Sequence, residues 1–175
     1  DQTRRQRQMC IRDSRYLVKR LKKESKRLRK MVEETLELSK LESNDAFQEN
    51  KKVSISDLVM ESWQTLKPLA EKKDIKIKLL IPTKYFISAD IENLKRAFIN
   101  ILDNAIRYSP ANEEIQIEIF KRDSSVVIRV RDKGIGLEEN ESNDIFSRFY
   151  RGDPSRTKFK KSGSGLGLSI TKKII

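Results

Sequence analysis

The first strong pattern along the chain is a narrow apolar seam between residues 16 and 41. Apolar residues recur there at alternating spacings of four and three, apart from two polar interruptions, and no glycine or proline occurs. A narrow stripe on a mostly polar helix buries little surface by itself. We therefore expect this helix to pack against other helices, as in a bundle or coiled coil, rather than stand alone on a domain surface. The seam consists of Leu17, Leu21, Leu28, Met31 and Leu38, widened by Val32, Leu36 and Leu41.

The segments on both sides of this helix carry no periodic pattern. Residues 1–14 show neither helical nor strand spacing, and we treat them as an irregular arm that need not belong to the native protein. Residues 44–52 are polar and typical of a linker. The chain therefore divides into the arm, a helix over 15–43, the linker, and a globular domain over 53–175.

Helical periodicity appears twice in the first half of this domain. Ser54 and Asp57 have the spacing of a capping box, which predicts a helix from there to about residue 73. Asp90 is expected to cap a second helix that runs to about residue 108. The inward faces of the two helices are predicted to consist of Leu58, Trp63, Leu66 and Leu69, and of Ile91, Leu94, Phe98, Ile101, Leu102 and Ala105.

Alternating apolar residues predict the strands of the same domain. One strand covers residues 75–81, and a hairpin pairs residues 115–119 with residues 126–130 around a turn at 123–125. Residues 85–88 add a short strand. Together these elements predict an α+β domain, a two-layer α/β sandwich in which a mixed sheet has its helices on one face.

Residues 137–162 are polar, basic and weakly patterned, which is typical of a long loop. Loops of that length inside compact domains are usually functional or disordered. Aromatic residues between 146 and 150 predict a short element that folds back onto the domain. The last residues of the chain begin a further helix.

The composition excludes several kinds of chemistry. The 175 residues include no histidine, which removes histidine-ligated metal sites, Ser-His and Cys-His nucleophile pairs, and acid–base catalysis by histidine. The single cysteine cannot form an internal disulfide. No apolar run approaches the roughly 18 residues of a membrane-spanning helix.

The net charge of +12 is concentrated at one end of the chain. Residues 1–30 hold 13 Lys/Arg and 3 Asp/Glu, whereas residues 31–175 hold 25 and 23. A basic arm of this kind can touch DNA or anionic lipid, but it is more often the solvated face of a helix. Because residues 31–175 are nearly balanced in charge, we expect no nucleic-acid partner.

Four short motifs carry the candidate chemistry, and the first lies on the helix that ends near residue 108. Amide oxygens are neutral hard donors that suit Mg²⁺ when phosphates supply the charge, and arginine meets phosphate oxygens in fork geometry. The alternative is a polar helix edge that faces water. The motif consists of Asn100, Asn104, Arg107 and Tyr108, which share one stripe beside the apolar face.

The other three motifs come from turns and loops. Asp132 ends a strand, where a carboxylate can accept a hydrogen bond from an exocyclic amine such as that of adenine. Gly134, Ile135 and Gly136 follow, and the glycines permit close backbone approach to a ligand. The third motif is the aromatic segment that contains Phe149. The fourth opens the last helix, whose free N–H groups favour phosphate, and it comprises Gly163, Ser164, Gly165, Leu166, Gly167 and Leu168.

Taken in order, the four motifs resemble the ATP-binding domain of the histidine kinases, in the superfamily shared with gyrase, Hsp90 and MutL. Residues 100–108 look like the N box, 132–136 like the first glycine box, 146–149 like the F box and 163–168 like the second glycine box. The helix over 15–43 resembles the second helix of that family's dimerisation and phosphotransfer hairpin. The resemblance implies a Bergerat-type ATP-binding fold, preceded by a helix from a homodimeric four-helix bundle.

The resemblance also implies roles for single residues. ATP and Mg²⁺ would bind between the helix of Asn104 and the long loop. Asp132 would select adenine, Tyr108 would flank the nucleotide, and Phe149 and both glycine boxes would line the site. The implied magnesium and phosphate ligands are Asn100, Asn104 and Arg107. The loop residues implied to reach the γ-phosphate are Arg151 and either Lys158 or Lys160.

One departure separates the branches of this superfamily. Gyrase-type members carry a water-activating glutamate four residues before the magnesium asparagine, and here that residue is Asn100. The resemblance therefore implies transfer of the γ-phosphate to a histidine on the first hairpin helix, and then to an aspartate of a response regulator. That helix and the family's last strands would lie outside this chain. The domain would be cytoplasmic, and a full-length parent would sit in the cytoplasmic membrane through upstream segments.

Two rival interpretations stay open at this point. An anti-sigma-type serine kinase of the same superfamily shares the nucleotide motifs but lacks the hairpin helix, so residues 15–43 count against it. A non-catalytic binding module built on the basic helix leaves the ordered motifs unexplained.

Overall fold

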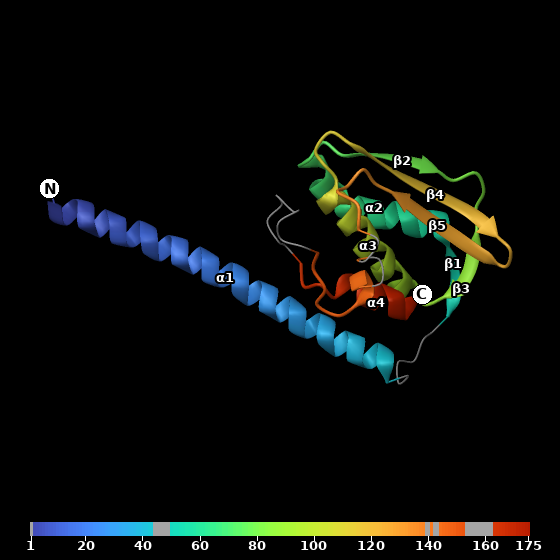
Figure 1. The fold of residues 1–175 in the computed structure, drawn as a ribbon, viewed down its shortest axis with the longest axis horizontal. Coiled ribbons are helices and arrows are strands. Elements are labelled where there is room, and N and C mark those ends of the chain that lie inside the picture. Colours follow the sequence, from blue (N-terminus) through green and yellow to red (C-terminus); the bar gives the residue numbers. More distant parts are fainter. Residues whose placement is uncertain (1, 44–49, 139–140, 142–143, 153–162) are drawn as a thin grey trace.

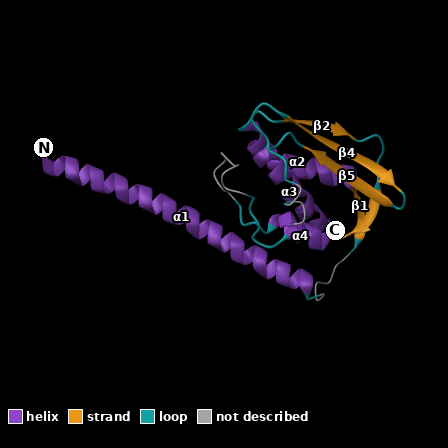
Figure 2. Cartoon of the chain, in the orientation of Figure 1, coloured by secondary structure: helices purple, strands orange, loops and turns teal. Residues whose placement is uncertain are grey.

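A long helix leads into a body of two layers, one of strands and one of helices (Figures 1 and 2). This α+β architecture confirms the fold class predicted from the sequence. The computed structural model describes side chains from residue 14 onward, and it describes the backbone of residues 2–43, 50–138, 141, 144–152 and 163–175. Among these described residues, none of the helices combines the length and the apolar character needed to cross a bilayer.

The long helix, α1 (Gln2–Glu42), has 41 residues and therefore extends about 60 Å. Its N-terminal half projects away from the body (Figure 1). Because the backbone is helical from residue 2, the prediction of an irregular arm over 1–14 is wrong for residues 2–14. Apolar periodicity marks where a helix is buried, not where a helix forms. This stretch lacks glycine and proline and is rich in arginine and glutamine, which favour helix without any apolar stripe.

The strands form two separate sheets. In the larger one β2 (Lys76–Leu80) pairs parallel with β4 (Glu114–Arg122), which pairs antiparallel with β5 (Ser125–Arg131). The other is an antiparallel pair of β1 (Lys51–Ser54) and β3 (Phe86–Ala89). The mixed sheet, the hairpin and the short strand are thus confirmed. The linker predicted over 44–52 is wrong at its end, since residues 51 and 52 gain strand structure from backbone pairing with β3 rather than from their own side chains.

Two helices, α2 (Ile55–Glu71) and α3 (Ile91–Tyr108), share the core with the strands. Both begin at the predicted caps, because the side chains of Ser54 and Asp90 accept hydrogen bonds from the backbone N–H groups of residues 57 and 93. The centre of the core consists of Leu58, Val59, Phe98, Leu102, Ile106, Ile115, Ile117 and Ile119. Ile91, predicted to face inward, is instead exposed, since it stands at the first position of α3 and Leu94 is the first residue to reach the core.

A second, smaller apolar cluster joins the end of α1 to the last helix, α4 (Gly167–Ile174). Leu38 of α1 is buried there against Leu166 and Ile170. The described part of the long loop contains a 3₁₀ turn, η1 (Asp144–Phe146), which packs on α4 with the Lys172 ammonium 5.5 Å from the Phe146 ring centroid. This contact confirms the prediction of a short element that folds back onto the body.

Candidate functional site

The first predicted motif lies along one edge of α3. Asn100, Asn104 and Tyr108 occupy successive turns, so the helix advances by about 6 Å from each to the next. Both asparagines are half-buried and Tyr108 is exposed, while neighbouring Leu102 and Ile106 are fully buried. The buried face thus fixes the helix against the sheet and leaves a row of two amides and one phenol along its edge.

The end of α3 meets the turn that follows β5. A Cβ atom placed on Gly134 would lie 3.2 Å from the carbonyl oxygen of Tyr108 and 2.6 Å from Asp132 Oδ1, so a larger residue would displace the Asp132 carboxylate and crowd the Tyr108 backbone. The Gly134 N–H donates to Asp132 Oδ1 at 2.7 Å, which orients the carboxylate. Gly136 has a φ of 68°, in the region that favours glycine. The first and second predicted motifs therefore come together here.

Large apolar side chains around this junction are exposed, although the domain buries comparable side chains in its core. Apolar groups left open beside a few oriented polar ones are typical of a small-molecule site. The flat face of a purine base would cover such groups. These residues are Tyr108, Ile135 and Leu137, and Phe149 of the third motif is exposed as well.

The start of α4 meets the other end of the row on α3. Asn100 Nδ2 donates to the carbonyl oxygen of Gly167 at 3.1 Å. Within the same glycine-rich segment, the Leu166 N–H donates to Ser164 Oγ at 3.2 Å. The first motif is therefore joined to the fourth at its Asn100 end, and to the second at its Tyr108 end.

The third motif contacts the fourth through its backbone. A Cβ atom on Gly165 would lie 2.8 Å from the carbonyl carbon of Phe149, and Gly165 itself has a φ of 81°. Phe149 also adopts a positive φ, 61°, which is uncommon for an aromatic residue. Strained backbone of this kind is concentrated at ligand sites and switch regions.

Arg107 does not extend freely from α3. Its Nε donates to Asp103 Oδ2 at 2.6 Å, one turn earlier on the same helix. The fork predicted for phosphate is thus engaged by a carboxylate in this structure.

Tyr150 forms a polar pair within the described part of the long loop. Tyr150 donates its hydroxyl hydrogen to Glu141 Oε1 at 3.0 Å. Burial and this hydrogen bond, together with neighbouring carboxylates, raise the pKa of Tyr150. Arg151 follows it and is half-buried. Lys158 and Lys160, predicted to reach the γ-phosphate, lie outside the described residues.

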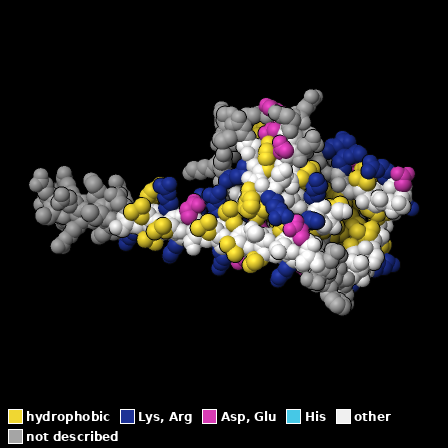
Figure 3. All heavy atoms as spheres, turned by 60° about the horizontal axis from the view of Figure 1, so that its bottom comes forward, with side chains coloured by type: hydrophobic (Ala, Val, Ile, Leu, Met, Phe, Trp, Pro, Cys, Tyr) yellow, Lys and Arg dark blue, Asp and Glu magenta, His cyan; other side chains and the backbone are white. Residues whose placement is uncertain are grey.

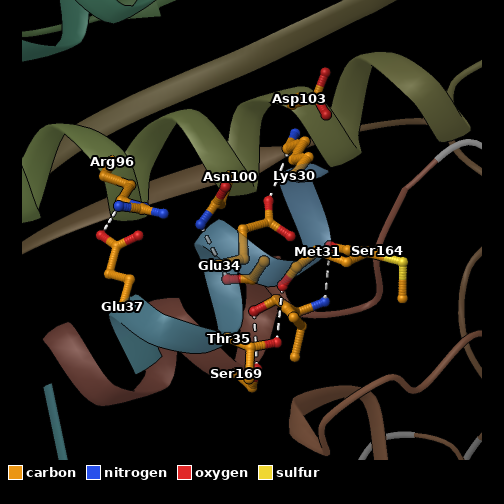
Figure 4. A network of polar contacts seen from close by, with 12 residues as sticks. Lys30, Met31, Glu34, Thr35, Glu37, Arg96, Asn100, Asp103, Ser164 and Ser169 are labelled. Carbon is orange, nitrogen blue, oxygen red and sulfur yellow. Dashed lines mark hydrogen bonds and ion pairs between the residues drawn. The ribbon is translucent and has the colours of Figure 1, made fainter. Parts of the chain in front are cut away.

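The C-terminal half of α1 packs beside the Asn100 end of this site, which the sequence did not predict. Figure 4 shows Glu37 and Glu34 of α1 directed toward α3, the first in an ion pair with Arg96. Burial lowers the pKa of Arg96, and the charge of Glu34 opposes that shift. Glu34 is buried and its Oε1 pairs with Lys30 Nζ at 3.6 Å. Leu38 belonged to the predicted seam, but nothing in the sequence singled out the two glutamates.

A divalent cation at this site would have few carboxylates to bind. Among the residues that the structure describes, no three or more Cys, Asp or Glu side chains gather as a metal cluster. The available protein ligands on α3 are the amide oxygens of Asn100 and Asn104. That donor set suits Mg²⁺ only when a phosphate group supplies the remaining oxygens and the negative charge.

Three comparisons with known proteins agree with this geometry. Residues 89–175 match the family model of histidine kinase-, DNA gyrase B- and HSP90-like ATPases. The sensor protein SphS of Synechococcus elongatus is 34% identical over 164 residues, which cover 90% of this chain and 40% of SphS. The signal transduction histidine-protein kinase ArlS of Staphylococcus aureus is 36% identical over 153 residues, covering 87% of this chain and 33% of ArlS.

The fold has solved counterparts as well. The nucleotide-free catalytic domain of histidine kinase ThkA superposes with a TM-score of 0.64 at 26% identity, over 73% of this chain and 80% of that one. The mycobacterial sensor histidine kinase MprB gives a TM-score of 0.62 at 27% identity, over 71% and 77%. The chain spans 40% or less of the length of the curated relatives named above. Its ordered motifs, its fold and these relatives together show that the chain carries a catalytic domain of the sensor histidine kinase family, whose ATPase model matches residues 89–175.

Proposed function

We propose that the body of this chain binds ATP with Mg²⁺ between α3 and the loop after β5, for transfer of the γ-phosphate to a protein histidine and then to a response-regulator aspartate. One observation carries the proposal. Four motifs meet in space across as many as 67 residues of sequence, through the contacts of Tyr108 with Gly134, Asn100 with Gly167 and Phe149 with Gly165. A chance set of polar turns would not converge in this way.

The two ends of the row on α3 suit the two ends of a nucleotide. Asp132, oriented by Gly134, accepts a hydrogen bond from the exocyclic amine of adenine, and the exposed apolar residues cover the base. Asn100 and Asn104 lie beyond it along α3, where they would hold Mg²⁺ and the phosphates. When bound, Mg²⁺ neutralises the negative charge that builds up on the transferred group.

To bind a nucleotide phosphate, the Arg107 side chain would exchange the Asp103 carboxylate for phosphate oxygens. Its pair with Asp103 joins residues four apart on an accessible helix face, and pairs of that kind contribute only about 0.2–0.5 kcal/mol. A phosphate group offers more oxygens and more charge than a single carboxylate. The Arg107 side chain therefore can leave Asp103 at little cost when a nucleotide binds.

The site favours transfer over hydrolysis. Position 100 carries an amide rather than a carboxylate, so α3 offers no general base at the place where the gyrase-type members activate water. Catalysis then consists of positioning and charge neutralisation, and the acceptor must be brought to the nucleotide by another protein segment.

The helix α1 is proposed to supply the dimer contact. Figure 3 shows apolar side chains along α1 that the body leaves uncovered. The exposed apolar residues of α1 include Leu17, Leu21, Leu28, Val32 and Leu36. A second copy of this helix, within a hairpin bundle, would cover them. The proposed partners are thus ATP, a second copy of the protein and a receiver domain, with the domain in the cytoplasm and its parent anchored in the cytoplasmic membrane.

Binding of a fluorescent ADP analogue to the 175-residue chain tests the nucleotide site. We expect saturable binding that weakens when EDTA removes Mg²⁺, and a Kd about tenfold higher for Asp132→Asn because a charge-assisted hydrogen bond becomes a neutral one. The matched control is Asp123→Asn, which makes the same change in the β4–β5 turn. Absence of binding by the unaltered chain, or equal weakening by both variants, would contradict the proposal.

A further inference from the structure

Lys73 makes a cluster of hydrogen bonds that the proposed function does not yet use. It lies in the turn between α2 and β2, and its Nζ donates to three backbone carbonyl oxygens at the end of α3. These are the oxygens of Ile106 at 2.9 Å, Arg107 at 2.6 Å and Ser109 at 2.9 Å. An ammonium group has three N–H donors, so every donor of Lys73 is directed at this one helix end.

The position of this charge has a physical reason. The last carbonyl groups of a helix have no partners within the helix, and they form the negative end of its dipole. A lysine ammonium satisfies both the unpaired oxygens and the dipole. The backbone N–H of Asn112 also donates to the Lys73 carbonyl oxygen at 2.8 Å. The turn of Lys73 is therefore bonded to the end of α3 and the residues after it both as a donor and as an acceptor.

The fastened segment is the one that forms the base end of the proposed nucleotide site. Tyr108 lies between the carbonyl groups that Lys73 holds, and its own carbonyl oxygen contacts Gly134. A shift of this helix end would therefore move Tyr108 and the turn that orients Asp132. Burial and the positive charge of Arg107 both lower the pKa of Lys73. Both effects disfavour the charged ammonium at this place, and the three carbonyl acceptors offset that cost.

We propose that Lys73 is a positioning residue for the base end of the nucleotide site, acting through the last turn of α3. The inference rests on the proposed nucleotide binding. Lys73 itself would not touch the ligand, because its three donors are directed at the backbone of α3. Its effect is a coupling between the α2–β2 turn and the site.

Three variants of the 175-residue chain test this role. Lys73→Met keeps the aliphatic stem and removes the donors, Lys73→Arg keeps charged donors, and Lys72→Met is the control in the same turn with an exposed side chain. The measurements are the Kd of a fluorescent ADP analogue with Mg²⁺, amide hydrogen exchange over residues 105–112 without nucleotide, and the Tm.

We expect Lys73→Met to raise the Kd about fivefold, at the lower end of typical couplings between sites, and to speed exchange over 105–112. Lys73→Arg should keep the Kd within about twofold of the original, because charged donors remain at this position. Lys72→Met should leave the Kd unchanged, because substitutions of exposed side chains away from special contacts have small effects. If Lys73→Met lowers Tm yet leaves the Kd unchanged at a temperature where it is folded, the role is structural only and the inference is overturned.

Two other results, loss of nucleotide binding by the unaltered chain and misfolding of Lys73→Met, have their own interpretations. If the unaltered chain and Lys72→Met both fail to bind, the proposed function fails, while the hydrogen-exchange result still reports on the link between Lys73 and α3. If Lys73→Met does not fold, Lys73→Gln replaces it, since a neutral amide retains two donors. Unchanged exchange and unchanged Kd in Lys73→Gln would then overturn the inference.

Discussion

At the scale of single residues, glycines bring the four motifs together. Gly165 lets two backbone segments approach more closely than a Cβ atom would allow, and Gly134 leaves room for the Asp132 carboxylate beside the Tyr108 backbone. Their role differs from that of Gly136, which has a positive φ but open space around it. Gly165 is therefore required for the space beside the Phe149 backbone, whereas Gly136 is required only for its backbone conformation.

Substitution by alanine separates these two requirements. Gly136→Ala should lower the free energy of unfolding by about 1 kcal/mol, the cost of a left-handed conformation. Gly165→Ala adds a clash with the Phe149 backbone and should cost a further 1–3 kcal/mol, roughly as overpacking does elsewhere. Urea unfolding followed by circular dichroism measures both. Equal destabilisation by the two variants would show that the Phe149 contact is relieved without cost.

The sequence predicts residues well where side chains carry the signal, and poorly where the backbone does. Asp132 and Asn100 are found because their side-chain chemistry and spacing are distinctive. Lys73 is missed because its partners are carbonyl groups 33 to 36 residues away, which no side-chain pattern reveals. The Phe149–Gly165 contact is predicted only as two separate motifs, since their approach depends on folding of the long loop.

At the scale of elements, the same division holds. The strands β4 and β5 are predicted closely because alternate residues such as Ile115 and Ile117 are buried on one face. The start of α1 is missed because those residues form helix without an apolar stripe, and β1 is missed because backbone pairing creates it. The seam on α1 is predicted as one continuous packing surface, yet only its end contacts the body, where Leu38 meets α4.

The divided seam leads to a prediction about α1. Leu38→Ala should lower the free energy of unfolding by about 2 kcal/mol, near the low end for a buried leucine because its cluster is small. Leu36→Ala is the control two residues earlier, and because Leu36 is 60% exposed in the single chain, its effect should stay within about 0.5 kcal/mol at a protein concentration where the chain is monomeric. Urea unfolding of each variant measures the difference. A cost for Leu36→Ala as large as that for Leu38→Ala would mean that α1 packs through its other face.

At the scale of the whole molecule, charge density and proposed function are divided between the same two parts of the chain, the long helix and the body. Residues 1–30 carry 13 Lys/Arg and 3 Asp/Glu, whereas the much longer segment 53–175 carries 22 and 17. Positive charge is therefore denser on the basic helix than on the body that holds the four motifs. The proposed nucleotide site and the proposed assembly helix are joined in one chain, and its 175 residues include no histidine.

This absence predicts where label from ATP goes. Incubated with γ-labelled ATP and Mg²⁺, the chain should acquire no acid-labile phosphohistidine, because it contains no imidazole to accept the phosphate. When a hairpin helix that carries the family's acceptor histidine is joined ahead of α1, acid-labile label should appear, and a His→Gln change in that helix should abolish it. The label is read on gels before and after acid treatment. Acid-stable label on the unaltered chain would contradict the assignment and favour the serine-kinase alternative, since hydroxyl esters survive acid and phosphohistidine does not.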